Sequence, residues 1–229
     1  MAVEEHSHCV RSLTLDLDGT LLDTIPDLAA AANATLAELG LPGLGEADVA
    51  ARVGLGIDQL VARCLSAVEA DAPGASGRLT EALPRFRAHY AACNGRGTHV
   101  YPGVIDTLAA LEARGFRLAC VTNKAAAFTL PLLARTGLAR FFGAVIAGDT
   151  LAEKKPHPQP LLEACARLGS SAPDNAHVGD SHHDLAAARA AGCVAICVDY
   201  GYGPPVDARE CDALVSAFPE ILALVRPAR

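Results

Sequence analysis

The sequence is poor in aromatic residues, since its 229 residues include no Trp, four Tyr and six Phe. Apolar residues still make up 51% of the chain and the mean hydropathy is +0.26, so there is ample material for a core. That core must be built mainly from Ala, Leu and Val. The length suits one domain, or one domain that carries an insertion.

Long apolar runs and an excess of positive charge are also missing. No run approaches the roughly 18 apolar residues of a membrane span, and the N-terminal stretch MAVEEHSHCVRS does not resemble a signal peptide. The net charge is −7, whereas nucleic acids and anionic membranes are usually bound through clustered Lys and Arg. We therefore expect a cytoplasmic protein with no nucleic-acid or membrane partner. We further expect a monomer or homodimer, although the sequence does not fix which.

Cysteine is present, but the CxxC spacing of redox and metal motifs is not. The eight cysteines are spread along the chain, and several lie inside apolar runs such as LACVT and CVAICV. We expect buried, reduced thiols rather than a disulfide framework.

Five short apolar segments predict strands, over 12–17, 117–121, 144–147, 176–178 and 194–198. Nearly continuous apolar runs are typical of parallel strands that are covered on both faces. Helical patterns lie between these segments, over 103–114, 125–136, 159–168 and 184–191, and each ends at a glycine. The alternation predicts an α/β fold, with a Rossmann-like, doubly wound parallel sheet.

One long stretch, residues 26–94, contains no convincing strand. It shows helical patterns over 26–39, 46–53, 58–69 and 78–92, with a loop over 71–78. We interpret it as an all-helical insertion that follows the first strand and lies over its end. The predicted division is a core of residues 1–22 and 98–229, and a helical cap of residues 23–97.

Polar residues follow several of the predicted strands. The pairs are Asp16 with Asp18, Thr122 with Asn123, Lys154 with Lys155, and Asp180 with Asp184. In an open parallel sheet, ligands bind at the carboxyl ends of the strands, so these residues should meet in one cleft. Carboxylates from two strand ends suit a hard cation such as Mg²⁺, which in turn attracts a phosphate. The sequence therefore predicts a site for phosphoryl transfer.

Each residue type fits a step of that chemistry. An ionised Asp16 can attack phosphorus, and Asp18 can give a proton to the leaving oxygen and later activate water. Lys155 adds a positive charge that offsets the charge of the transition state. Phosphate oxygens can be bound by the hydroxyl of Thr122 and by the amides of Gly19, Thr20 and Asn123.

Purely structural explanations compete with these roles. The aspartates after the first strand could form a solvated turn. Thr122 and Asn123 could cap the helix that follows them, and Asp180 and Asp184 could also be capping residues.

Several other residues stay open to two explanations. The Gly54-Leu55-Gly56 turn either connects two helices or brings cap backbone close to the substrate. Arg52 and Arg63 are candidate cap cations that resemble ordinary surface charge. The pair His182-His183 is more typical of an exposed loop than of a magnesium site.

Four motifs, in order, carry a resemblance to a known family. The runs DLDGT, VTN, KKPHPQP and VGDSHHDLAAARAAG resemble the motifs of haloacid-dehalogenase-type phosphatases. The resemblance implies a Rossmann-like core, a helical cap, and an aspartyl-phosphate intermediate on Asp16. It implies Asp18 as general acid/base, and Thr122 and Lys155 as phosphate-binding residues.

The same resemblance implies the metal ligands. They would be the carboxylates of Asp16 and Asp180 and the main-chain carbonyl of Asp18, with Asp184 acting on Mg²⁺ indirectly or through water. Of the two neighbouring lysines, Lys155 precedes the proline of the motif and is the one that matches.

Longer stretches, among them VGLGIDQLV and VYPGVIDTLAALEARG, are similar to bacterial phosphoglycolate phosphatases. This resemblance implies a small phosphorylated metabolite as the substrate, with 2-phosphoglycolate hydrolysed to glycolate and phosphate. The alternatives are a phosphatase for a sugar phosphate, such as an amino-sugar 6-phosphate, and phosphoglucomutase-like transfer. A regulatory protein on an inactive fold is the non-enzymatic alternative.

Overall fold

A six-stranded parallel sheet forms the centre of the computed structural model, which describes residues 7–69, 75–204 and 206–228. The strand order is β6-β5-β2-β7-β8-β9. The strands are β2 (Ser12–Leu15), β5 (Arg117–Val121), β6 (Ala144–Ile146), β7 (Asn175–Gly179), β8 (Val194–Val198) and β9 (Ala213–Val215). The five predicted strands are confirmed. The short edge strand β9 was not anticipated.

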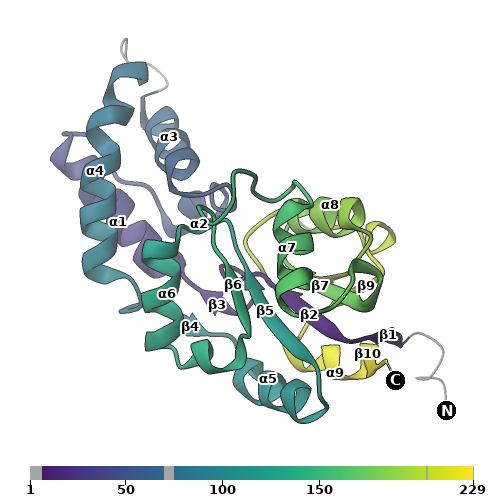
Figure 1. Cartoon of the computed structure of the whole chain (residues 1–229). Coiled ribbons are helices and arrows are strands. Elements are labelled where there is room, and N and C mark those ends of the chain that lie inside the picture. The colour runs from purple at the N-terminus through teal and green to yellow at the C-terminus, as the bar shows by residue number, and fades with distance from the viewer. Residues whose placement is uncertain (1–6, 70–74, 205, 229) are drawn as a thin grey trace.

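Helices cover both faces of this sheet, as Figure 1 shows. One apolar cluster joins Leu13 and Leu15 of β2 to Leu108 of α5, and the other joins Val121 of β5 to Leu161 of α7. The first face carries α5 (Val104–Ala113), α6 (Ala126–Arg135) and α9 (Ile221–Leu224), and the second carries α7 (Gln159–Arg167) and α8 (His182–Ala191). The doubly wound α/β fold is therefore confirmed, although α8 begins two residues before the predicted start.

Four helices between the first and second strands of the sheet form a separate helical unit beside it (Figure 1). They are α1 (Ile25–Glu38), α2 (Glu46–Ala50), α3 (Ile57–Val68) and α4 (Ala75–Cys93). The unit has its own apolar cluster, which includes Leu36, Leu60 and Phe86. The predicted loop over 71–78 was too long, because α4 already includes residues 75–78; residues 71–74 lie outside the described part.

Two short strands join the helical unit to the sheet. β3 (Leu22–Asp23) pairs antiparallel with β4 (His99–Val100), so the chain leaves and re-enters the core side by side. Next to them, the buried carboxylate of Asp27 accepts hydrogen bonds from the amides of Gly95, Gly97 and Thr98. The division at residues 23 and 97 stays a prediction, but this crossing ties the two segments closely together.

The remaining elements close the core. β1 (His8–Val10) pairs in parallel with β10 (Val225–Pro227), which ties the described ends of the chain together. Single 3₁₀ turns cover Leu138–Phe141, Ala172–Asp174, Ala208–Glu210 and Phe218–Glu220. In the described part of the chain, no helix has the length and apolarity needed to cross a bilayer.

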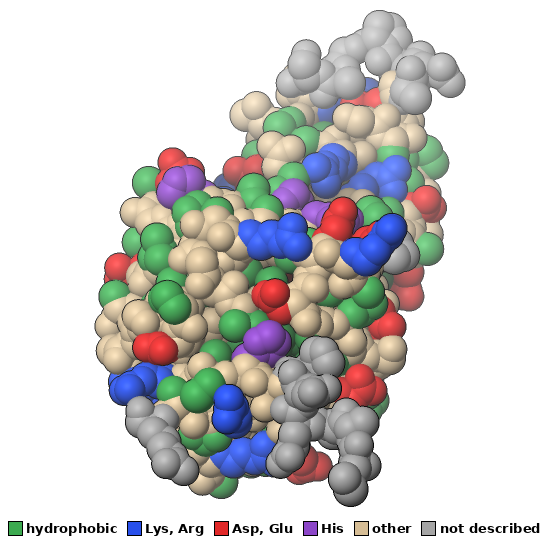
Figure 2. Space-filling model, turned by 90° about the vertical axis from the view of Figure 1, so that its right-hand side faces the viewer, with side chains coloured by type: hydrophobic (Ala, Val, Ile, Leu, Met, Phe, Trp, Pro, Cys, Tyr) green, Lys and Arg blue, Asp and Glu red, His purple; other side chains and the backbone are tan. Residues whose placement is uncertain are grey.

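Acidic and basic side chains are interspersed on the face that Figure 2 displays. All eight cysteines are free thiols, and Cys120, Cys165 and Cys197 are among the buried ones.

Candidate active site

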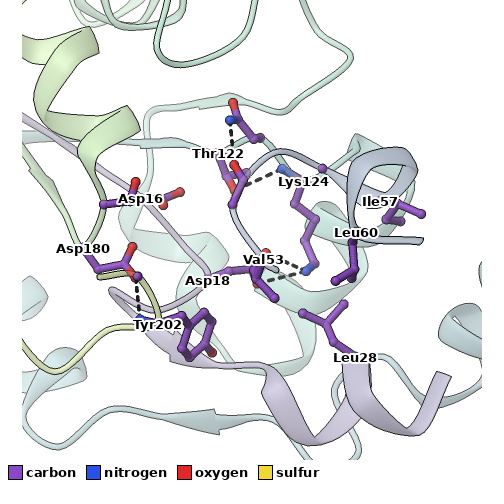
Figure 3. A pocket seen from close by; sticks show the side chains of 15 residues that line it. Asp16, Asp18, Leu28, Val53, Ile57, Leu60, Thr122, Lys124, Asp180 and Tyr202 are labelled. Atoms are coloured by element: carbon purple, nitrogen blue, oxygen red, sulfur yellow. Dashed lines mark hydrogen bonds and ion pairs between the residues drawn. The ribbon is translucent and has the colours of Figure 1, made fainter. Parts of the chain in front are cut away.

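A cavity lies at the carboxyl ends of β2, β5 and β7, where the helical unit meets the sheet (Figure 3). The core lines it with Asp16, Asp18, Thr122, Asn123, Lys124, Asp180, Ser181, Tyr202 and Gly203. The helical unit lines it with Leu28, Val53, Gly54, Gly56, Ile57 and Leu60. Most of the predicted site residues, which are far apart in the sequence, are thus brought to one place.

Lys155 is the buried cation beneath this cavity. Its Nζ lies 2.8 Å from Oδ1 of Asp16 and 2.6 Å from Oδ1 of Asp184. Burial disfavours the ammonium, but the two carboxylates outweigh burial and raise the pKa of Lys155. Lys154 is exposed. Of the two lysines, Lys155 is therefore the one that enters the site, as the motif implied.

Three carboxylates crowd around the same point. Asp16, Asp180 and Asp184 can each offer one oxygen such that these oxygens lie within 4.8 Å of one another. Burial raises the pKa of Asp16 to about 8, against the pull of Lys155, and the charge of Asp184 adds to the increase. Burial, again aided by Asp184, raises the pKa of Asp180 to about 7. The raised pKa values show that three negative charges are unfavourable here without a counter-charge. A hard divalent cation would supply that charge, and carboxylate oxygens are ligands it prefers.

Asp184 is held by protein groups on every side. Its Oδ2 accepts from the backbone and hydroxyl of Ser181, in a capping box at the start of α8. Its Oδ1 contacts Lys155 and His177. Burial opposes ionisation of Asp184, but Lys155 and His177 outweigh it and hold its pKa well below the usual range. The capping explanation is thus correct for Asp184. Because protein donors already occupy both of its carboxylate oxygens, the geometry is consistent with an indirect role at a metal.

Glycines allow the chain to approach Asp180. Oδ2 of Asp180 accepts from the amide of Tyr202 at 2.8 Å. A Cβ at Gly19 or at Gly201 would collide with the side chain of Asp180, and Gly19 also has a φ of +84°. These two positions therefore need glycine in order to keep Asp180 in place.

The structure corrects the role expected for the turn after Asp18. The amide of Gly19 donates to the carbonyl of Leu22, and the amide of Thr20 donates to that of Leu17. Neither residue lines the cavity. Gly19 and Thr20 therefore shape the turn rather than present free amides to phosphate.

Asp18 lines the cavity next to Lys124, a cation that was not among the predicted site residues. Nζ of Lys124 lies 2.9 Å from Oδ1 and 2.8 Å from Oδ2 of Asp18, and Oγ1 of Thr24 donates to Oδ1 at 2.9 Å. Burial disfavours the charged Lys124, but Asp18 outweighs burial and raises the pKa of that lysine. The only sign in the sequence was its position directly after the VTN motif.

Thr122 and Asn123 follow β5 and face the cavity. The side chain of Asn123 donates to the carbonyls of Gly54 and Lys155, both at 2.9 Å, and accepts from the amide of Lys155 at 3.0 Å. The capping explanation for this pair is wrong, because the N-cap of α6 is Ala125. Asn123 instead joins the helical unit to the loop that carries Lys155.

Two glycines of the helical unit, Gly54 and Gly56, line the cavity with φ values of +118° and +87°. The backbone of the unit therefore forms part of the cavity wall; its contact with the substrate stays a prediction. Arg52 and Arg63 line a separate surface hollow instead.

Other candidates lie outside the carboxylate cluster or were not anticipated. His182 is exposed, with Nδ1 3.7 Å from Glu210, and neither it nor His183 belongs to the group of possible metal ligands found in the described residues.

Tyr202 lines the cavity but was not predicted, because it lies on the loop after β8. Its hydroxyl donates to the carbonyl of Leu22 at 3.1 Å.

The family model for haloacid dehalogenase-like hydrolases matches residues 13–198. A protein of Nitrosospira multiformis named phosphoglycolate phosphatase is 47% identical over 219 residues, covering 95% of this chain and 96% of the relative. A plasmid-encoded phosphoglycolate phosphatase of Cupriavidus necator is 46% identical over 220 residues, covering 95% and 94%.

Solved structures agree with the sequence relatives. The crystal structure of a predicted phosphoglycolate phosphatase from Haemophilus somnus 129pt superimposes with a TM-score of 0.87 and 32% identity. The superposition covers 93% of this chain and 96% of that one. The chain is thus an enzyme of the haloacid dehalogenase-like hydrolase family, similar to phosphoglycolate phosphatases over nearly its whole length.

Proposed function

We propose that the protein is a Mg²⁺-dependent phosphatase that hydrolyses 2-phosphoglycolate to glycolate and phosphate. One observation carries the proposal: the buried ammonium of Lys155 lies between Asp16 and Asp184, with Asp180 beside them. Such a set can bind a phosphate through a cation while it presents a carboxylate to phosphorus.

Mg²⁺ suits this donor set because all the side-chain donors are carboxylate oxygens. In the proposed site, Asp16 and Asp180 supply carboxylates, Asp18 supplies its main-chain carbonyl, and Asp184 acts indirectly. When bound, the cation would neutralise carboxylate and phosphate charge. Lys155 would hold Asp16 and the phosphate in register.

The proposed reaction has two steps. A carboxylate oxygen of Asp16 attacks phosphorus, the bond to the leaving oxygen breaks, and Asp18 gives that oxygen a proton. A water molecule then attacks the phosphorus of the aspartyl-phosphate, gives a proton to Asp18 and frees Asp16. Lys124 and Thr24 donate to both oxygens of Asp18 between them, which suits the carboxylate form that accepts this proton.

The wall of the cavity supports a small acid rather than a sugar. Every side chain that the described helical unit contributes is apolar, namely Leu28, Val53, Ile57 and Leu60, apart from two glycines. A sugar phosphate needs partners for its hydroxyls, and buried hydroxyls without partners bind poorly. The relatives named phosphoglycolate phosphatase support the same substrate.

We propose that residues 23–97 select the substrate and that residues 1–22 and 98–229 carry the chemistry. The free cysteines support a reducing, cytoplasmic location for the protein. Exchanging residues 26–94 for those of a sugar phosphatase should change substrate preference more than the rate on an aryl phosphate.

The test is phosphate release from a panel of small phosphorylated metabolites, with and without Mg²⁺. We expect 2-phosphoglycolate to give the highest kcat/KM, and a chelator to abolish turnover. The Asp16→Asn variant should lose at least about a thousandfold in kcat while its melting temperature is kept. Undiminished phosphate release by this variant would refute the nucleophile, and a preferred sugar phosphate would refute the substrate.

A further inference from the structure

We propose that Lys124 binds the carboxylate of the substrate and thereby selects phosphorylated acids over neutral phosphate esters. The inference rests on the proposed phosphatase function and assigns a subsite within the same cavity. Lys124 follows Asn123 at the end of β5, so its side chain crosses from the core toward the helical unit, as Figure 3 shows.

Charge is the first argument. Among the described residues that line the cavity, Lys124 is the only Lys or Arg, while Asp16, Asp18 and Asp180 bring three carboxylates. Lys155 already serves Asp16 and Asp184. A substrate that carries a carboxylate besides its phosphate needs a further cation. Lys124 is the lining residue that supplies one, because Asp18 does not offset its charge while that carboxyl holds the proton for the leaving oxygen.

The position of the ammonium is fixed from two sides. On the core side, Nζ donates to Oδ1 of Asp18 at 2.9 Å and to Oδ2 at 2.8 Å. The ring of Tyr90 on α4 lies behind it, with its centroid 4.9 Å from Nζ. A lysine ammonium has three N–H donors. Two contact Asp18, and Tyr90 faces the third, which a ligand in the cavity would take over.

The start of α3 also favours an anion in this cavity. Gly56 and Ile57 line the cavity, and no side chain caps this helix end. Asp58, the acid of the first turn, is instead bound to Arg87 at 2.7 Å. The partial positive charge of the helix end therefore adds to that of Lys124.

The apolar wall strengthens the interaction. Leu28, Val53 and Leu60 face the cavity, and they exclude water from the space between Lys124 and a bound carboxylate. An ion pair is stronger where the local dielectric constant is low. A neutral ester of the same size gains nothing from the charge, so the difference between the two ligands reports on Lys124.

Nearby cations provide matched controls. Nζ of Lys154 lies 3.7 Å from the point where a Cβ on Gly56 would stand, but Lys154 is exposed and does not line the cavity. Arg63 belongs to the separate surface hollow. Replacing either one changes the charge of the protein by the same amount as replacing Lys124.

The experiment compares kcat/KM for 2-phosphoglycolate and for ethyl phosphate, which lacks the carboxylate. Lys124→Met should lower kcat/KM for the acid about a hundredfold more than that for ethyl phosphate. Lys124→Arg should keep part of the preference, and Lys154→Met should keep all of it. An equal loss on both substrates would mean that Lys124 acts only through Asp18, and would overturn the proposal.

A binding measurement separates the subsite from the reaction. Calorimetry of Asp16→Asn, with and without Lys124→Met, gives the affinity for both ligands in the absence of turnover. The preference for the acid should disappear with Lys124; if it persists, the subsite is refuted. If the unmodified enzyme does not hydrolyse 2-phosphoglycolate but Asp16→Asn still binds acids through Lys124, the proposed reaction fails and the subsite stands.

Discussion

Nε2 of His177 lies 3.0 Å from Oδ1 of Asp184, in a buried layer beneath the active site. Its other ring nitrogen, Nδ1, lies 3.0 Å from Oγ1 of Thr14. An ionised Asp184, which also accepts from Lys155, can only accept, so Nε2 must carry the hydrogen. We therefore assign the neutral tautomer in which the hydroxyl of Thr14 donates to Nδ1. Burial lowers the pKa of His177, in agreement with a neutral ring.

Further buried hydrogen bonds connect polar side chains of β2 and β7 at increasing distance from the active site. Asn175 donates to Oγ1 of Thr14 at 2.9 Å, and Ser12 donates to Oδ1 of Asn175 at 2.8 Å. Alternate residues of these strands face the side covered by α7 and α8, so the four polar side chains form one stripe. Each buried group has a partner, and the stripe fixes the position of Asp184 through His177.

Thr14→Val should test this stripe, because it keeps the shape of the side chain and removes only the hydroxyl. It leaves Nδ1 of His177 without a donor, and we expect a loss of about 1–3 kcal/mol in the free energy of unfolding. Urea denaturation measures the loss. Thr14→Ser, which keeps the hydroxyl, should lose less. Equal stability of Thr14→Val and the unmodified protein would contradict the assigned hydrogen bonds.

The metal-free protein should lose stability as the pH rises. Asp16 and Asp180 have pKa values of about 8 and about 7, above the ordinary value of 3.8. The folded state thus binds protons that the unfolded state has already released between pH 4 and pH 8. Buried His177, whose pKa is lowered, acts in the opposite direction below its ordinary pKa of 6.5. Above pH 6.5 the two carboxyls dominate, and stability falls as the pH passes through 7 and 8.

Melting temperatures of chelator-treated protein between about pH 6.5 and pH 8.5 measure this trend. Mg²⁺ should flatten it, and adding Mg²⁺ near pH 6.5 in weak buffer should release protons. Asp16→Asn, which removes one of the two groups, should show a weaker pH dependence without metal. A metal-free melting temperature that rises toward pH 8.5 would contradict the expected sign.

Strand ends were the part of the site that the sequence predicted best. Asp16, Thr122 and Asp180 follow apolar runs, and parallel topology alone brings such positions together. Lys124 and Tyr202 escaped notice because their contacts depend on how loops return to the cavity, which no periodicity encodes. His177 escaped notice for another reason: a single polar residue in an apolar run does not reveal a partner on a helix.

The fold shows the same limits. β9 is a three-residue strand at the edge of the sheet beside β8, and its short apolar run ALV was not recognised as a strand. The loop expected over 71–78 was inferred from glycine and proline, but residues 75–78 belong to α4, a helix that packs against α1 and α3. The glycines that approach Asp180 were visible in the sequence, yet only the tertiary structure shows what they approach.

Gly148→Ala should damage the site by steric contact alone. Gly148 follows β6, its φ is not positive, and a Cβ there would collide with the carbonyl of Asn123. The backbone must shift, so we expect about 1–3 kcal/mol of destabilisation and a lower kcat. Gly77→Ala is the control, because no atom lies within 4 Å of its Cβ position. Normal activity and stability of Gly148→Ala would show that the backbone around Gly148 and Asn123 shifts at no cost, and would contradict the prediction.

Asn123→Ala should loosen the helical unit from the core. The side chain of Asn123 joins the carbonyl of Gly54 to both backbone groups of Lys155, so its removal leaves the buried Lys155 amide without an acceptor. We expect kcat/KM to fall about ten- to a hundredfold. Amide hydrogen exchange over residues 53–57 should become faster, because the contact that holds this turn against the core is lost.

Asn33→Ala is the matched control for this last prediction. Asn33 also bridges backbone through its side chain, with hydrogen bonds of 2.9 and 2.8 Å to Leu44, but it lies within the helical unit and away from the cavity. Its loss should therefore lower stability without changing kcat/KM in the same proportion. If both variants lost stability and activity in parallel, Asn123 would be a packing residue. Faster exchange over 53–57 in Asn123→Ala alone would mark it as the contact that closes the site.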